Sequence, residues 1–120
     1  MPLSMDNRNR MVCLYDCYGG LFTEKQRTLF EYYFDEDLSL AEIADLVGTS
    51  RQAVHNSLSR CEEALETFEA ALGMLARSRA VDAVLDEAAQ AIETGLATGE
   101  WPEERFAEIL AQLKMTRKAD

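Results

Sequence analysis

Positive charge is scarce in this sequence. Its 120 residues include 12 Lys and Arg against 22 Asp and Glu, a formal net charge of −10. Phosphate contacts supply most non-specific affinity for nucleic acid, so an acidic chain starts at a disadvantage in that role. The deficit is uneven, because residues 21–60 hold four basic and seven acidic groups, whereas residues 61–120 hold six basic and thirteen acidic groups. A small local basic face therefore stays compatible with the composition.

Long apolar runs are also missing. No stretch approaches the ~20 apolar residues needed to span a bilayer, and the first residues lack the apolar core of a secretory signal. The three cysteines, Cys13, Cys17 and Cys61, are an odd number in such a chain, which indicates reduced thiols. We expect a soluble, cytoplasmic protein with no membrane partner.

The usual signatures of catalysis and metal binding are absent. His55 is the only histidine, and no second cysteine pair completes a site with Cys13 and Cys17, so we interpret the cysteines as small buried hydrophobes. No phosphate-cradling Gly loop or nucleophile elbow occurs. We read His55 as a polar contact on an exposed face, and we predict no enzyme, no cofactor and no metal.

Helical periodicity runs through the whole chain. Residues 5–18 carry an apolar stripe, with Ser4 as a plausible N-cap and Gly19-Gly20 as the end. Three further helices open on a capping box, a Ser or Thr followed three residues later by Gln or Glu. The boxes pair Thr23 with Gln26, Ser39 with Glu42, and Thr49 with Gln52. No strand pattern occurs, so we predict an all-α fold.

The third and fourth predicted helices have the spacing of a helix-turn-helix. About three residues separate them, and Gly48 is placed to adopt the left-handed conformation at the end of the third helix. Ile43 and Val47 on one helix face Val54 and Leu58 on the other. We therefore predict a helix-turn-helix bundle with a long fourth helix and a C-terminal helical extension.

The fourth helix carries a heptad seam that runs beyond residue 60. Its members step by four and three residues: Val54, Leu58, Cys61, Leu65, Phe68, Leu72 and Leu75. A seam of that length needs a partner, either the later helices of the chain or a second subunit. For the second case we predict a homodimer interface formed by Leu65, Phe68, Leu72 and Leu75.

The rest of the chain, residues 74–120, is predicted to be an extension. We predict domains at 1–73 and 74–120, with a helix over about 74–94, a breaker in "TGLATGE", and a last helix from Trp101-Pro102. Val81, Val84, Leu85, Ala88 and Ile92 supply the first apolar stripe, and Phe106, Ile109, Leu110 and Leu113 the second. Both stripes are expected to face inward.

The first turns of the fourth helix carry side chains suited to a groove of nucleic acid. Arg pairs bidentately with guanine, Gln or Asn with adenine, and first-turn N–H groups suit a phosphate. The candidate nucleic-acid-binding residues are Ser50, Arg51, Gln52, His55, Asn56 and Arg60. Lys25 and Arg27 are candidates for contacts with the phosphate backbone of the nucleic acid. The alternative, ordinary polar residues on a scaffold that binds protein, stays open on charge alone.

Residues 10–72 resemble the YlxM family of small bacterial proteins. The resemblance is carried by "FTEKQR" at 22–27, "DLSLAEIA" at 37–44 and "SRQAVH" at 50–55, and we find no family motif after about residue 75. It implies a helix-turn-helix similar to region four of bacterial sigma factors. This chain departs from the family at His55-Asn56, where members often have Tyr-Asp, which replaces an acidic groove-facing residue with a neutral one.

Members of that family typically lie beside genes of the signal recognition particle. The resemblance thus implies a regulatory protein of that pathway that binds the particle's RNA or its GTPase. The residues themselves also fit a sequence-specific DNA-binding regulator, or a homodimer whose helix-turn-helix only builds structure.

Overall fold

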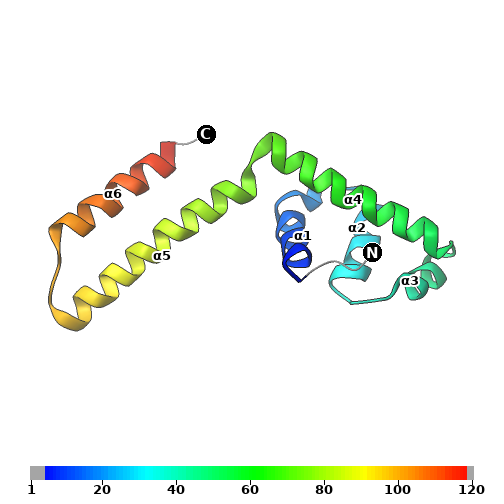
Figure 1. The fold of residues 1–120 in the computed structure, drawn as a ribbon, viewed down its shortest axis with the longest axis horizontal. Coiled ribbons are helices and arrows are strands. Elements are labelled where there is room, and N and C mark those ends of the chain that lie inside the picture. Colours follow the sequence, from blue (N-terminus) through cyan, green and yellow to red (C-terminus); the bar gives the residue numbers. More distant parts are fainter. Residues whose placement is uncertain (1–4, 119–120) are drawn as a thin grey trace. The chain divides into compact units, whose positions relative to one another are not determined.

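The computed structural model describes residues 5–118, and over that range the chain is helical without strands (Figure 1). The elements are α1 (Met5–Tyr18), the 3₁₀ turn η1 (Gly19–Leu21), α2 (Glu24–Phe34), α3 (Leu40–Val47), α4 (Arg51–Leu72), α5 (Met74–Thr98) and α6 (Glu103–Lys118). The all-α prediction is confirmed. Ser4, the expected first N-cap, lies outside the described residues. No helix of the described part is both long and apolar enough to cross a membrane.

The chain divides into two compact units, Met1–Gly73 and Met74–Asp120, each with its own packing. In the first unit α4 runs across α1, α2 and α3 (Figure 1). One core cluster joins Leu29 of α2, Ile43 and Ala44 of α3, and Val54 and Leu58 of α4. Ile43, Val54 and Leu58 are residues that the helix-turn-helix spacing placed between its two helices, and Ala44 and Leu29 complete the cluster. The fourth predicted member, Val47, is 39% exposed, so that part of the prediction is wrong.

The heptad seam of α4 finds its partner in the earlier helices. Val54, Leu58, Cys61 and Leu65 are buried, and the ring of Phe68 lies 5.8 Å from the ring of Tyr18 in α1. Leu65 is buried, and α4 packs on α1 and α2 within the first unit. The seam also ends early: Leu72 is 60% exposed, Gly73 (φ 62°) terminates α4, and Leu75 belongs to α5.

Two of the three predicted capping boxes are present. Thr23 and Ser39 each accept a hydrogen bond from the N–H three residues on, and Gln26 and Glu42 accept one in return. Gly48 is left-handed, as predicted, with φ 74°.

The third box, at Thr49, is wrong. The N–H of Thr49 donates to the Ala44 carbonyl at 3.0 Å, so Thr49 completes the end of α3. Ser50 caps α4 instead, and its hydroxyl oxygen accepts from the Ala53 N–H at 3.0 Å.

Two arginines fasten α1 to the rest of its unit. The Arg8 guanidinium donates to the carbonyls of Tyr33 and Phe34 at the end of α2, at 2.9 and 3.1 Å, and pairs with Asp37. Arg10 forms a bidentate ion pair with Glu66 of α4, in which its Nε donates to Oε2 at 2.9 Å and its Nη2 donates to Oε1 at 2.6 Å. Both basic groups are therefore engaged in holding the fold.

The second unit is a helical hairpin in which α6 returns along α5 (Figure 1). The predicted breaker was placed too early, because α5 continues through Gly95 to Thr98 and ends at Gly99, with φ 78°. Gly95 is there for packing. A Cβ at this position would lie 2.4 Å from the Trp101 ring, which rests on the helix at that point.

The apolar stripes of the hairpin turn inward only in part. Val84, Ala91 and Ile109 are buried. Leu85, Ile92 and Leu110, which we expected to face inward, are 48–52% exposed. Two helices can cover only one side of each other, so the remaining apolar residues stay at the surface.

Candidate nucleic-acid interface

The start of α4 presents a continuous polar surface beside the turn of the helix-turn-helix. We call it the α4 face, formed by Ser50, Arg51, Gln52, His55, Asn56 and Arg60. All except His55 are exposed, and His55 is half-buried. The residues on the opposite side of the same turns, Val54 and Leu58, are buried in the core, which fixes the direction in which the α4 face points.

A groove of about 590 Å³ brings the α4 face against the start of α3. Arg51, Gln52 and His55 line one wall, and the first residues of α3 line the other, namely Ser39, Leu40 and Ala41. No carboxylate lines the groove, and Arg51 is its charged residue. In a chain of net charge −10 this is a locally positive surface.

Two helix N-termini meet at this groove. Ser39 is the N-cap of α3, and Ser50 is the N-cap of α4. First-turn N–H groups and the helix dipole both favour an anion at such ends. The Ser50 hydroxyl oxygen accepts from Ala53, so its own hydrogen is available to an incoming phosphate oxygen.

The two amides of the α4 face are joined to each other. The Gln52 side chain donates to the Asn56 side-chain oxygen at 3.0 Å. The side-chain carbonyl oxygen of Gln52 and the amide hydrogens of Asn56 are not used in this bond and are available to a ligand. One acceptor and one donor side by side complement the adenine edge in a major groove.

His55 is placed differently from the prediction of a polar contact on an exposed face. Its Nδ1 is buried and has no hydrogen-bond partner. Glu62, two turns further along α4, lines a small cavity of about 20 Å³ together with His55. Burial raises the pKa of Glu62, and the nearby His55 works in the opposite direction. The sequence offered one usable sign of this neighbour, a spacing of seven residues that places both on one side of a helix.

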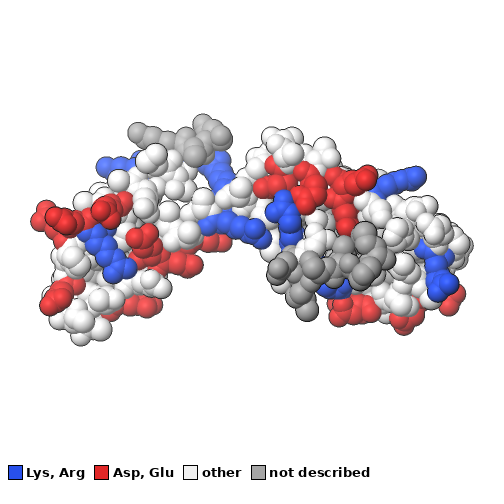
Figure 2. Space-filling view, viewed as in Figure 1, with Lys and Arg blue, Asp and Glu red and all other residues white. Residues whose placement is uncertain are grey.

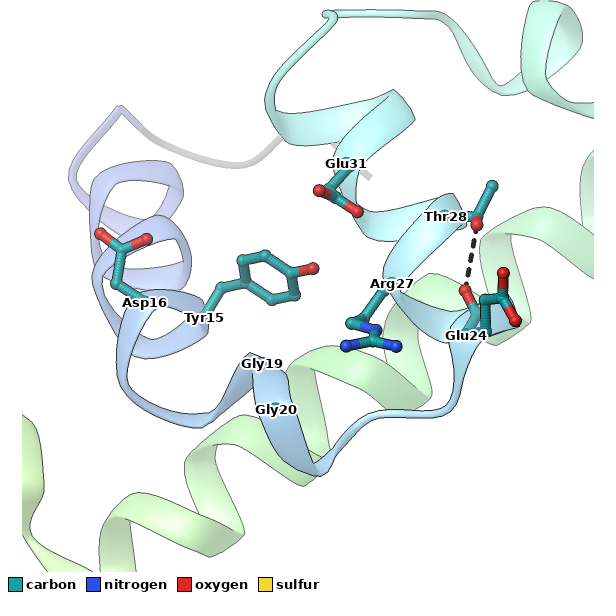
Figure 3. A pocket seen from close by; sticks show the side chains of 8 residues that line it. All are labelled: Tyr15, Asp16, Gly19, Gly20, Glu24, Arg27, Thr28 and Glu31. Atoms are coloured by element: carbon teal, nitrogen blue, oxygen red, sulfur yellow. Dashed lines mark hydrogen bonds between the residues drawn. The ribbon is translucent and has the colours of Figure 1, made fainter.

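The two auxiliary basic residues on α2 do not join the groove. Lys25 is exposed, whereas Arg27 lines a separate pocket of about 560 Å³ together with Tyr15 and Glu31 (Figure 3). Asp16 and Glu24 lie in the same pocket, so carboxylates offset the charge of Arg27. Burial, followed by the Glu31 carboxylate, raises the pKa of the Tyr15 phenol.

Sequence reasoning missed Ser39, Leu40 and Ala41 as part of the site. They carry no nucleic-acid signature, and they reach the groove only because α3 crosses α4 at its first turns. The prediction of a helix-turn-helix, taken literally, could have located them, since that motif sets the start of one helix beside the next.

The cysteines lie in the fold and not in this groove. Cys13 and Cys17 are half-buried on α1, and Cys61 is buried on α4, where desolvation raises the pKa of its thiol to about 11. Within the part of the chain that the structure describes, no group of three or more His, Cys, Asp or Glu side chains is arranged to hold a metal ion.

Comparison with known proteins identifies the family. The family model described as "Putative helix-turn-helix protein, YlxM / p13 like" matches residues 5–98. The chain belongs to this family, UPF0122. The YlxM resemblance and the helix-turn-helix prediction are therefore confirmed.

Relatives from several bacteria are similar over most of their length. A UPF0122 protein of Clostridium botulinum is 47% identical over 74 residues, 62% of this chain and 68% of the relative. One of Symbiobacterium thermophilum is 45% identical over 89 residues, 74% and 83% of the two chains. One of Listeria innocua is 36% identical over 109 residues, 91% and 96% of the two chains.

These matches extend further along the chain than our motif-based resemblance. That resemblance stopped near residue 72, whereas the family model continues to residue 98, the last residue of α5. The long helix α5 is thus part of the family pattern.

Proposed function

We propose that this chain is a regulatory helix-turn-helix protein that binds nucleic acid through the α4 face. One observation carries the proposal: the groove between the starts of α3 and α4 is lined by Arg51, Gln52 and His55 and by no carboxylate. Because no carboxylate lines it, this groove can be approached by an anionic ligand even though the chain as a whole is acidic.

The family resemblance favours RNA of the signal recognition particle as the ligand, with the particle's GTPase as a second component of the same pathway. Duplex RNA presents a deep and narrow major groove, so the α4 face would bind unpaired or bulged bases. The exposed amides of Gln52 and Asn56 can bond such bases on their edges.

Double-stranded DNA is the second candidate, and a specific feature favours it. Arg51, Gln52 and Asn56 are exposed on the first turns of the second helix of a helix-turn-helix, the part that such proteins place in the major groove. Arg can pair with guanine, and Gln or Asn can pair with adenine.

The test measures binding of the full chain to the particle's RNA, and to DNA obtained by random-site selection, by fluorescence anisotropy. At the preferred site Arg51→Ala should weaken binding by about 1–3 kcal/mol, roughly 5- to 150-fold. Arg27→Ala is the matched control, since it removes the same charge from a pocket that also holds Glu24 and Glu31. It should change affinity less than Arg51→Ala does.

The salt dependence separates this site from diffuse charge binding. Two arginines on the α4 face would neutralise about two phosphates, so log Kd should change with log salt by a slope of about 2. No binding to RNA or DNA at physiological salt, together with unchanged capture of the GTPase from nuclease-treated lysate, would move the function to protein recognition.

A further inference from the structure

The hairpin of α5 and α6 leaves one of its sides uncovered and apolar. We call this the hairpin face: Val81, Leu85, Ile92 and Leu96 of α5, with Leu110 of α6. The α5 members recur at four and seven residues and so form one stripe of the helix. Leu85, Ile92 and Leu110 are about half exposed, and Leu96 is 75% exposed.

The stripe continues a groove between the two helices. Val81 and Val84 of α5 and Leu110 and Leu113 of α6 line a cavity of about 500 Å³. Because Val81 and Leu110 belong both to this groove and to the hairpin face, the exposed leucines flank a single apolar surface. Monomeric proteins rarely leave so large a contiguous surface open to water.

Charge is distributed along the hairpin with opposite signs at its two ends. At the open end, residues 74–81 and 111–117 hold four basic groups and no acidic one, and Arg77, Lys114 and Arg117 line the groove. At the closed end, residues 93–108 hold five acidic groups and one basic group. Figure 2 shows acidic side chains concentrated around that closed end.

On α6, residues from the closed end, the hairpin face and the open end lie along one side of the helix. Glu103, Leu110 and Arg117 follow one another at intervals of seven residues, so an acidic, an apolar and a basic residue lie in line. A surface of this kind complements itself when it is turned end for end, because each basic end then meets an acidic end.

We propose that two copies of this chain pair through their hairpin faces in antiparallel orientation and form a four-helix bundle. The stripe of leucines is buried between the copies, and the groove-lining arginines of each copy meet Glu100 and Glu103 of the other. A parallel pairing would set like charges together at both ends and is disfavoured. The interface lies on α5 and α6, because the α4 seam is buried within the chain from Val54 to Leu65.

The available area suits a stable dimer. Helices of 25 and 16 residues are about 37 and 24 Å long, and each is about 10 Å wide, so the face offers about 600 Å². Stable interfaces bury about 600–1,000 Å² on each partner.

Light scattering of the full chain after size exclusion tests the pairing. The expected mass is about twice the 13.5 kDa of one chain at 100 μM. Ile92→Glu with Leu96→Glu should give the single-chain mass, since it places four carboxylates in the interface. Met115→Glu is the matched control: Met115 is 73% exposed but lies on a different side of α6 from Leu110, and its variant should keep the double mass.

A charge exchange tests the orientation. Arg77→Glu with Arg117→Glu brings the open end to net zero charge, and Glu100→Lys with Glu103→Lys brings the closed end to net zero charge. Each change removes the attraction between unlike ends in a pair of identical copies, and only a mixed pair regains it. Each protein alone should dissociate at least tenfold more readily than wild type, and an equal mixture of the two should recover a dimer that contains one copy of each.

Three results would overturn the proposal. They are a single-chain mass for the wild type at 100 μM, a double mass that survives Ile92→Glu with Leu96→Glu, and no recovery on mixing the two folded charge variants. A hairpin face covered by its own first unit gives the first result, and a foreign partner gives it as well.

Discussion

At the scale of the residue, the basic side chains divide by task. Arg8 lies against the rings of Tyr33 and Phe34 and bonds the carbonyls that end α2, and Arg10 is held by Glu66. Arg51, by contrast, lines an exposed groove. Composition alone counts all arginines alike, so it does not distinguish Arg8 and Arg10, which are engaged within the fold, from Arg51, which is exposed on the α4 face.

The pair of Arg10 and Glu66 gives a prediction about acid stability. The hydrogen bond from Arg10 holds the pKa of Glu66 below its ordinary value of 4.5. A lowered pKa stabilises the folded state above pH 4.5, and this stabilisation is lost as the pH falls through the lowered value. Because the pair is partly exposed, Glu66→Gln should cost about 0.5 kcal/mol at pH 7.

Urea unfolding monitored by circular dichroism from pH 7 to pH 2 would measure this. The gap between wild type and Glu66→Gln should be constant above pH 4.5 and close under acid. Glu63→Gln, an exposed position on the same helix, controls for the lost charge. A gap that persists at pH 2 would show that the variant acts through packing.

The candidate site could be predicted by residue type but not by surroundings. The polar set from Ser50 to Arg60 was evident, because helical spacing separates it from Val54 and Leu58. The half-burial of His55 and the hydrogen bond between Gln52 and Asn56 depend on how α3 packs against α4 and on the side-chain conformations, which sequence does not reveal. Arg27 was selected by charge, yet its neighbours include three carboxylates brought in from two helices.

At the scale of the element, the junction of α3 and α4 yields a paired prediction. Ser50→Ala removes the cap of α4 and should destabilise the first unit by about 1 kcal/mol. Thr49→Ala leaves the backbone N–H that bonds Ala44, and should stay within about 0.5 kcal/mol of wild type.

Urea titrations of the two variants decide between the caps. If Thr49→Ala loses as much unfolding free energy as Ser50→Ala, or more, then Thr49 is the N-cap and α4 begins one residue earlier. The pattern of Thr49 and Gln52 pointed there because sequence alone does not reveal that Thr49 still belongs to the end of α3.

Helix existence was predictable throughout, and helix partners were not. Periodicity located every helix of the described chain, since caps and apolar spacing are local properties. The partner of the α4 seam is a non-local property, and the seam packs on helices that precede it in the chain. The prediction of a helix break at Gly95 was wrong for a related reason. The role of Gly95 depends on Trp101, which packs on it and comes from beyond the end of α5.

At the scale of the whole molecule, the two units should differ in their ability to fold alone. Residues 1–73 contain a complete core, from Met11 of α1 to Leu65 of α4. We expect this fragment to unfold cooperatively in urea with a slope of about 1 kcal/mol per molar.

Residues 74–120 alone should behave differently. Two helices bury too little apolar surface for independent stability, so the helicity of this fragment should rise with its concentration as copies pair. Circular dichroism between 5 and 500 μM, about a hundredfold range chosen to span a micromolar Kd, would show this. Helicity independent of concentration would mean that the hairpin is stable on its own.

The aromatic residues follow the same division into units, and this gives each unit its own optical signal. Trp101, the single tryptophan, rests on Gly95 beside Phe106 in the hairpin, whereas the four tyrosines all lie in the first unit. Selective excitation of the indole therefore reports the closed end of the hairpin alone. Pairing of hairpins can thus be followed in an unlabelled sample through the indole emission, without interference from the tyrosines of the first unit.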